Sequence, residues 1–222
     1  MKVYIIDTET TNADDTAEII EAAWLDMDGG EYCERFKPQG QIAFGAMATH
    51  HILPSDLEGC RESAAFILPA CDFVVGHNID FDWRVMGSPD AKSICTLAFC
   101  RHLWPELDSH KQGAMMYFLF GEEAREMVQK AHCALDDVKM CQMIFYACIN
   151  ELAQRGVNVD SWEDIWQASE MARIPTVMSF GKHKGKPLAE VPEDYINWYL
   201  KQAEQDQYMR TALLNEMIRR RS

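Results

Sequence analysis

Three short clusters of acidic and histidine residues have the residue types that hydrolytic chemistry needs. They read Asp-Thr-Glu-Thr-Thr at 7–11, His-Asn-Ile-Asp-Phe-Asp at 77–82 and His-Cys-Ala-Leu-Asp-Asp at 132–137. Any one of them alone is more typical of an exposed surface, because acidic side chains mostly lie in solvent. The first is the most informative, because Asp7 and Glu9 follow an apolar run and alternate residues of a strand share one face. Two neighbouring carboxylates repel each other unless a cation neutralises them, so this cluster indicates a divalent-metal site.

The spacing of the third cluster predicts where a helix begins. On a regular helix, residues five apart point about 140° away from each other. His132 and Asp137 can therefore share a site only if the helix starts after His132. We expect His132 on the preceding loop, where a histidine that is neutral near pH 7 could accept a proton, and Asp137 in the first turns.

The elements that must position these clusters follow from apolar patterning. Residues 2–6 and 72–76 have the composition of buried strands, and 18–27 with 31–37 form a predicted hairpin around an Asp-Gly-Gly turn. We further expect helices at 64–70, 80–86 and 97–103, a strand at 93–96, and a long helix within the segment 131–154 that stops at Gly156. Antiparallel strands followed by alternating strands and helices predict an α/β fold with a mixed sheet flanked by helices.

Taken together, the three clusters resemble the motifs of a known nuclease family. Their order and spacing are similar to those of the DEDDh-type 3′-to-5′ exonucleases, the DnaQ-like group. Residues 43–52 also resemble a segment that precedes a short helix in that family. The resemblance covers roughly residues 1–155, and it implies an RNase H-like domain whose mixed sheet has five strands.

The resemblance selects among spare carboxylates. In the second cluster the family's ligand follows Phe81, which selects Asp82 rather than Asp80. In the third, the spacing of five from the histidine selects Asp137 rather than Asp136. The implied metal ligands are Asp7, Glu9, Asp82 and Asp137. The implied substrate contacts are Thr8, Thr10, His77 and Asn78.

The reaction implied by the resemblance is hydrolysis of phosphodiester bonds from a 3′ end. Two Mg²⁺ ions are the expected cofactors, with Mn²⁺ able to substitute, because all-oxygen ligands select hard cations. His132 is implied as the base that takes a proton from the attacking water. The expected substrates are 3′ ends of single- and double-stranded DNA, the products nucleoside 5′-monophosphates, and the expected setting DNA repair.

The C-terminal part has a different composition. We expect a linker helix within 156–173, with Ser161 as its N-cap, and a small basic module at 174–222 that contains a hairpin and a helix. The turn Phe-Gly-Lys-His-Lys-Gly-Lys at 180–186 is no P-loop, since three residues rather than four separate its glycines. One interpretation is a turn that only adds solubility. The other, which we favour, is that its lysines, Lys182, Lys184 and Lys186, bind phosphates, because residues 173–188 contain four basic residues and no acidic one. With Tyr-x-x-Trp at 195–198, this turn resembles the exodeoxyribonuclease X group of the same family.

The net charge of −14 at first argues against nucleic acid as a partner. The charge is uneven, however: residues 173–222 contain nine basic and six acidic residues, which leaves −17 for the first 172. We therefore expect weak, salt-sensitive nucleic-acid binding at the metal site and the lysine turn. Apolar runs are too short for a membrane helix, and we expect a cytoplasmic protein with eight reduced cysteines.

The sequence leaves three alternative functions open. An RNA-trimming exonuclease would use the same site, because no residue reveals how a 2′-hydroxyl is treated. A nucleic-acid-binding module with an inactive site is a second alternative, of another class. A zinc hydrolase built on Cys95, Cys100 and His102 is a third, although no pair of cysteines has the Cys-x-x-Cys spacing. Protein partners are not predicted.

Overall fold

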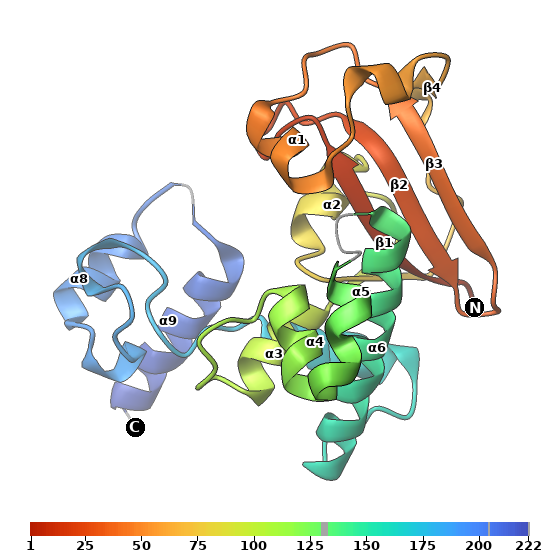
Figure 1. Ribbon diagram of the computed structural model, residues 1–222. Helices are drawn as coiled ribbons and strands as arrows, with labels where there is room; N and C mark the ends of the chain where they lie inside the picture. Colours follow the sequence, from red (N-terminus) through yellow and green to blue (C-terminus); the bar gives the residue numbers. More distant parts are fainter. Residues whose placement is uncertain (130–132, 204, 222) are drawn as a thin grey trace. The chain divides into compact units, whose positions relative to one another are not determined.

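The computed structural model describes residues 1–129, 133–203 and 205–221. The chain forms two compact units, Met1–Ser169 and Glu170–Ser222, and each is described by itself. Figure 1 shows the elements of both along the chain. Among the described residues, no helix has the length and apolar character needed to cross a membrane.

The first unit is built on a mixed sheet with the strand order β4-β3-β2-β1-β5-β6. The strands are β1 (Val3–Thr10), β2 (Ile19–Asp26), β3 (Glu31–Lys37), β4 (Arg61–Glu62), β5 (Phe73–Gly76) and β6 (Lys92–Cys95). β1, β2 and β3 are antiparallel, which confirms the predicted hairpin, whereas β5 pairs parallel to β1 and β6 parallel to β5. The sheet has six strands rather than five, because the two-residue β4 pairs with the end of β3.

Helices cover this sheet and complete the expected α/β architecture. They are α1 (Phe44–His50), α2 (Asp80–Val85), α3 (Thr96–Leu103), α4 (Gln112–Phe120), α5 (Arg125–Gln129), α6 (Ala134–Gln154) and α7 (Trp162–Ala172). α6 packs against β1 and β2, and it lies beside α3 and α4 (Figure 1). The buried face of α6 includes Val138, Ile144 and Phe145, and Ile5 and Ile6 of β1 are fully buried as well. A central sheet strand and the start of α6 are thus held together by the main core.

Two predicted elements differ in the structure. β1 does not end at Ile6 but continues to Thr10, which pairs with Ile19 of β2, so the first acidic cluster lies on the strand itself. The helix predicted at 64–70 is wrong: Ser63–Ala65 makes a single 3₁₀ turn, and Phe66 then packs edge-on against the Phe36 ring at 5.6 Å. Pro69 follows, and the residue before a proline is biased away from helix.

The helix expected as a linker lies across the unit boundary. Its N-terminus is as predicted, because Asp164 N–H donates to Ser161 Oγ at 3.1 Å and Ser161 N–H donates back to the Asp164 carboxylate. Trp162 stacks on Phe145 of α6, with ring centroids 5.6 Å apart, so the first turns of α7 pack on the first unit. The last turn belongs to the second unit.

The second unit has a small core of its own. A short antiparallel bridge joins Val177 to Pro187 and closes the lysine turn, and α8 (Glu193–Tyr199) and α9 (Gln207–Arg221) follow. The buried residues of its core are Met178, Leu188, Val191, Ile196, Tyr199, Met209, Ala212, Leu213 and Met217. The expected turn and helix are therefore present, and α9 is an additional helix that supplies about half of the core.

Candidate metal centre

β1 presents two carboxylates at the end of its buried run. Val3 to Ile6 are buried, and beyond them the strand alternates, with Thr8 and Thr10 buried and Asp7 and Glu9 only half-buried. This alternation follows from the pleat, which sends successive side chains to opposite faces. Asp7 and Glu9 therefore share one face, as the sequence indicates.

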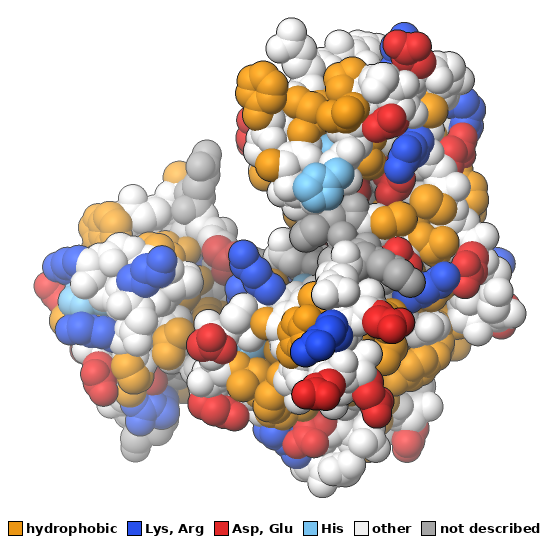
Figure 2. Space-filling model, viewed as in Figure 1, with side chains coloured by type: hydrophobic (Ala, Val, Ile, Leu, Met, Phe, Trp, Pro, Cys, Tyr) orange, Lys and Arg blue, Asp and Glu red, His pale blue; other side chains and the backbone are white. Residues whose placement is uncertain are grey.

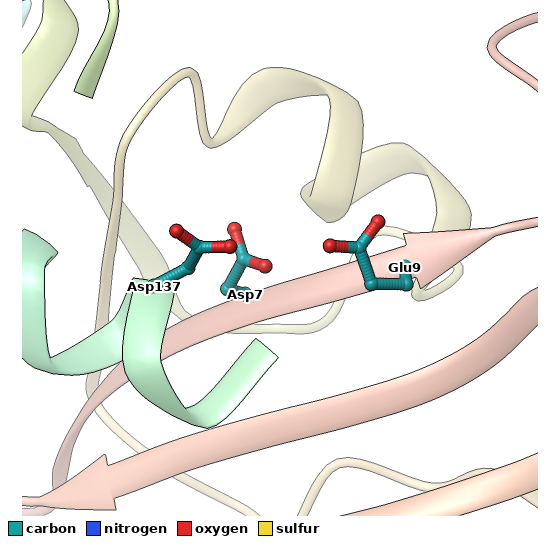
Figure 3. A group of neighbouring side chains, drawn as sticks. All are labelled: Asp7, Glu9 and Asp137. Carbon is teal, nitrogen blue, oxygen red and sulfur yellow. The ribbon is translucent and has the colours of Figure 1, made fainter. Parts of the chain in front are cut away.

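The start of α6 brings a third carboxylate to the same place. α6 begins at Ala134, after Cys133, whose carbonyl accepts hydrogen bonds from the N–H groups of Asp136 and Asp137 at 2.9 and 3.0 Å. One carboxylate oxygen each of Asp7, Glu9 and Asp137 lies within 4.8 Å of the other two. Figure 3 shows the three carboxylates turned toward one another from β1 and α6. The structure thus places Asp137, rather than Asp136, in this group.

Asp82 lies close to the group but is held by β1. It sits in the first turn of α2 and is 6% exposed, whereas Asp80 on the same turn is exposed. Its Oδ1 accepts hydrogen bonds from Thr8 N–H at 3.0 Å and from the Thr8 hydroxyl at 2.6 Å. Burial raises the pKa of Asp82 to about 6 despite these two bonds. Three of the four predicted ligands therefore converge, and the fourth is anchored beside them.

The three converging carboxylates are electrostatically unfavourable without a cation. Burial, followed by repulsion from Asp82 and Asp137, raises the pKa of Asp7 well above its ordinary range. Burial and repulsion from Asp137, Glu21 and Asp82 raise the pKa of Glu9 to about 8. Anionic oxygen donors at this spacing fit a hard divalent cation, which would relieve the repulsion and displace the protons.

Glu21 is a further carboxylate at this site that sequence reasoning missed. It lies on β2 directly opposite Glu9, and it is only 2% exposed. Its Oε1 accepts a hydrogen bond from Arg35 Nε at 2.8 Å, and its Oε2 accepts one from Ala134 N–H at 3.0 Å. Glu21 thereby ties the N-terminus of α6 to the sheet. An acid inside the apolar run Ile-Ile-Glu-Ala is the signal that could have indicated it.

Gln112 at the start of α4 is a second missed residue. Its Nε2 donates to the Asp137 carbonyl at 2.8 Å and to Asp137 Oδ1 at 3.2 Å. The second bond orients the Asp137 carboxylate and the first holds its backbone, as groups behind metal ligands commonly do. Nothing in the composition of 105–130 distinguishes this glutamine, because its role depends on α4 lying beside α6.

A cavity of about 530 Å³ adjoins Gln112. Its lining includes His77, Asn78, Arg101 and Lys111, so basic side chains and an amide face the same space. His77 Nδ1 lies 2.9 Å from the Thr96 hydroxyl and Nε2 lies 2.8 Å from the His110 carbonyl. Burial lowers the pKa of His77 to about 4, so its ring is neutral at physiological pH.

The remaining predicted site residues are Thr10, His132 and the three lysines of the turn. The Thr10 hydroxyl donates to the Asn12 carbonyl at 2.7 Å, and so its side chain holds the loop after β1. His132, the predicted base, falls outside the described residues. Lys182, Lys184 and Lys186 are exposed on the turn of the second unit.

The alternative zinc site is not formed. Cys95 and Cys100 are buried, and Cys100 Sγ lies 3.8 Å from Cys148 Sγ. In the described parts of the chain, only one group of three or more His, Cys, Asp or Glu side chains lies close enough together to hold a metal ion. Its members are Asp7, Glu9 and Asp137. The thiols are therefore small core side chains.

Comparisons with known proteins match both units. Residues 168–205 match the family model described as "Putative quorum-sensing-regulated virulence factor". Exodeoxyribonuclease 10 of Escherichia coli strain K12 is 26% identical over 210 residues, which cover 87% of this chain and 88% of that protein. The protein of the same name from Escherichia coli O6:H1 matches equally well.

Solved structures share the fold over about three quarters of the chain. Exonuclease X in complex with 5′ overhanging duplex DNA covers 74% of this chain and 99% of its own, with 23% identity and a TM-score of 0.54. The Pan2 catalytic unit of Neurospora crassa covers 75% of this chain and 29% of its own, with 18% identity and a TM-score of 0.52. Exonuclease I from Methylocaldum szegediense covers 79% and 44%, with 19% identity and a TM-score of 0.51. The expected fold and resemblance are thereby confirmed: the chain is similar in sequence to exodeoxyribonuclease 10, and it shares the RNase H-like α/β fold of these nuclease structures.

Proposed function

We propose that this protein is a metal-dependent 3′-to-5′ exodeoxyribonuclease. The observation that carries the proposal is the convergence of Asp7, Glu9 and Asp137 from two elements, with one oxygen of each within 4.8 Å of the others. A buried Asp82 beside this group supplies a fourth carboxylate. The homology to exodeoxyribonuclease 10 and the DEDD fold support an exonuclease rather than another metal-dependent hydrolase.

Each carboxylate has a part in holding cations. Asp7, Glu9 and Asp137 would bind them directly, and Asp82 is fixed by Thr8 at the edge of the same group. Two divalent cations, Mg²⁺ or in its place Mn²⁺, would lower the pKa of a bound water and would neutralise charge on the leaving oxygen. Glu21 and Gln112 keep the start of α6 and Asp137 in position.

Proton transfer needs a base next to the cations. His132 immediately precedes Cys133, the residue that caps α6, and Asp137 is in the first turns of that helix. In this proposal His132 takes the proton from the attacking water, which a neutral imidazole near pH 7 can do.

The adjoining cavity suits the nucleotide chain that leads to the scissile bond. Arg101 and Lys111 line it, and cations of this kind bind phosphate oxygens. We place Asn78, which is exposed in its lining, in contact with the substrate. The other predicted substrate contacts would act indirectly. Thr8 would hold Asp82, Thr10 would hold the loop after β1, and His77 would hold the cavity wall.

The proposed substrates are single- and double-stranded DNA with free 3′ ends, and the products are nucleoside 5′-monophosphates. A role in DNA repair and a cytoplasmic location stay predictions from the sequence. The test below also includes RNA as a substrate, because no residue in the described site distinguishes a 2′-hydroxyl.

Digestion of 5′-labelled oligonucleotides with Mg²⁺ or with chelator tests the proposal. A descending ladder with Mg²⁺, its loss with chelator and its loss in Asp7→Asn are expected. Asp80→Asn is the matched control, because Asp80 is the exposed carboxylate next to the site, and it should digest at the wild-type rate. Cleavage by Asp7→Asn at the wild-type rate would overturn the proposal, and faster digestion of matched RNA would change its substrate.

A further inference from the structure

The second unit presents an exposed aromatic surface on α8. Tyr195 and Trp198 lie three residues apart, which puts them on one face of the helix, and their ring centroids are 5.2 Å apart. Trp198 is 52% exposed, whereas Ile196 and Tyr199 on the same helix are buried in the core. Folding of this unit therefore buries the other side of α8 and leaves a large flat ring in solvent.

The lysine turn is shaped against these aromatic rings. Lys182 Nζ lies over the Tyr195 ring, 5.2 Å from its centroid, and the His183 ring meets Tyr195 edge-on at 4.6 Å. Gly181 has a φ of +66°, and a Cβ there would collide with Tyr195 Oη. Glycine at position 181 therefore lets the Tyr195 hydroxyl lie close to the backbone of the turn. Such packing is more than a solubilising loop requires.

The backbone of the turn is also fixed. Met178 N–H donates to the Lys186 carbonyl at 2.9 Å, and Gly185 N–H donates back to the Met178 carbonyl at 2.8 Å. Lys182, Lys184 and Lys186 are exposed on this frame, and none of them forms an ion pair with a described residue. Residues 173–188 contain four basic residues and no acidic one.

A cavity of about 350 Å³ joins the two features. It is lined by Lys182, Asp194, Tyr195 and Trp198. These four residues and the neighbouring Lys184 and Lys186 form what we call the aromatic–lysine surface. In Figure 2, Lys and Arg side chains lie beside hydrophobic ones on the visible face of the second unit. The surface therefore offers an aromatic face, an array of cations and one carboxylate within a single small region.

This combination points to one class of ligand. Exposed aromatic rings beside cations bind single-stranded nucleic acid, because each base has a flat face to stack and each linkage carries a negative charge. A duplex hides its base faces in the stack. A run of acidic side chains offers no flat ring to Trp198, and Asp194 would repel it, whereas Asp194 can accept hydrogen bonds from the amino groups of a base.

We propose that the aromatic–lysine surface binds single-stranded nucleic acid, with a base stacked on Trp198 and phosphates on Lys182, Lys184 and Lys186. The surface lies within the second unit and adds to the proposed nuclease a contact with the strand outside the metal centre. Residues 168–205, which match a family model, contain the whole of it. Its test uses binding without cleavage and so does not depend on the proposed function.

The test is fluorescence anisotropy of a labelled single-stranded oligothymidylate with the full chain in chelator. Without divalent cations no cleavage is expected, and the acidic centre repels phosphate. Trp198→Ala should weaken binding about fivefold or more, because fivefold is about the smallest loss of affinity expected when one stacked base is lost. Each Lys→Gln change in the turn should reduce the slope of log K against log salt by about 0.7. Trp198→Phe keeps an aromatic face and should retain most of the affinity.

Matched controls come from the first unit. Tyr146→Ala removes an aromatic side chain that is 51% exposed on α6, and Lys37→Gln removes an exposed lysine; both should bind as wild type. Wild-type binding by Trp198→Ala, or equal loss in Tyr146→Ala, would overturn the inference. Equal displacement of the oligonucleotide by polyglutamate of the same charge would also overturn it. Asp7→Asn should bind normally in chelator, so failure of the nuclease proposal would be seen separately.

Discussion

The two units of this protein use charge in opposite ways. The unit Glu170–Ser222 has nine basic and seven acidic residues, so its net charge is +2, and the first unit carries −16. In the first unit the critical charges are half-buried, packed against each other and fixed by hydrogen bonds from α4, α6 and the sheet. In the second unit the lysines are exposed on a turn. A buried, organised site should respond strongly to one substitution, whereas an exposed array should respond in small increments.

The largest expected effect separates two adjacent carboxylates of α6. Asp137→Asn should lower the cleavage rate by on the order of 10²–10³-fold, as for removal of a group that stabilises charge in a transition state. Asp136→Asn should stay near the wild-type rate, because Asp136 is outside the group of converging oxygens. Single-turnover kinetics with Mg²⁺ measure both. Equal losses in the two variants would break the assignment of Asp137.

Glu21 tests whether the first unit depends on buried polar contacts. Glu21→Ala leaves Ala134 N–H and the Arg35 guanidinium without their partner, which should cost about 1–3 kcal/mol of unfolding free energy. Glu21→Gln keeps an acceptor for Ala134 N–H and should lose less. Urea unfolding of the metal-free chains measures the difference, with Glu58→Ala as an exposed comparison. Equal stability of wild type and Glu21→Ala would show that α6 needs no such anchor.

The pH dependence of stability gives a graded effect. The pKa of Glu9 in the folded chain, about 8, lies above its ordinary value of 4.5, so its contribution to stability is complete below about pH 4.5. That contribution is lost as pH rises through 8, by at most about 1.4 kcal/mol per pH unit. Metal-free Glu9→Gln should therefore lose less stability than wild type between pH 5 and 8. The exposed Glu58→Gln should keep the wild-type slope. The same slope in Glu9→Gln would contradict burial and repulsion at Glu9 as the source of the pH dependence.

The smallest expected effect lies in the second unit. Lys184→Gln should raise KM for single-stranded DNA by about threefold at low salt and leave kcat unchanged, because one phosphate contact contributes little alone. Lys201→Gln, at another exposed lysine of the unit, should change neither constant. Steady-state kinetics at two salt concentrations test this. A change in kcat would mean that the turn acts in the chemical step, and the contrast between the units would fail.

Much of the site could be predicted because its spacing is local. A site shared by His132 and Asp137 needs a helix start between them, and α6 begins at Ala134. Alternation along a strand placed Asp7 and Glu9 on one face. Glu21 could not be assigned in this way, because its importance arises from its contacts with Arg35 and Ala134, far away in the sequence.

The parts of the fold that were missed share a physical cause. The apolar segment 64–70 was expected to be helical, but Phe66 packs against Phe36 of the sheet, and the residue before Pro69 is biased away from helix. α4 and α9 show little amphipathic pattern, so their helices depend on packing that the sequence does not display. Local periodicity thus predicted the central elements, and tertiary contacts determined the rest.

Binding of Mn²⁺, followed by the electron paramagnetic resonance signal of the free ion, tests the central claim most directly. We expect that wild type binds Mn²⁺, that Asp7→Asn and Asp137→Asn bind it about tenfold or more weakly, and that Asp80→Asn binds as wild type. Equal Mn²⁺ binding by all four proteins, or no binding by wild type, would contradict a metal centre at Asp7, Glu9 and Asp137.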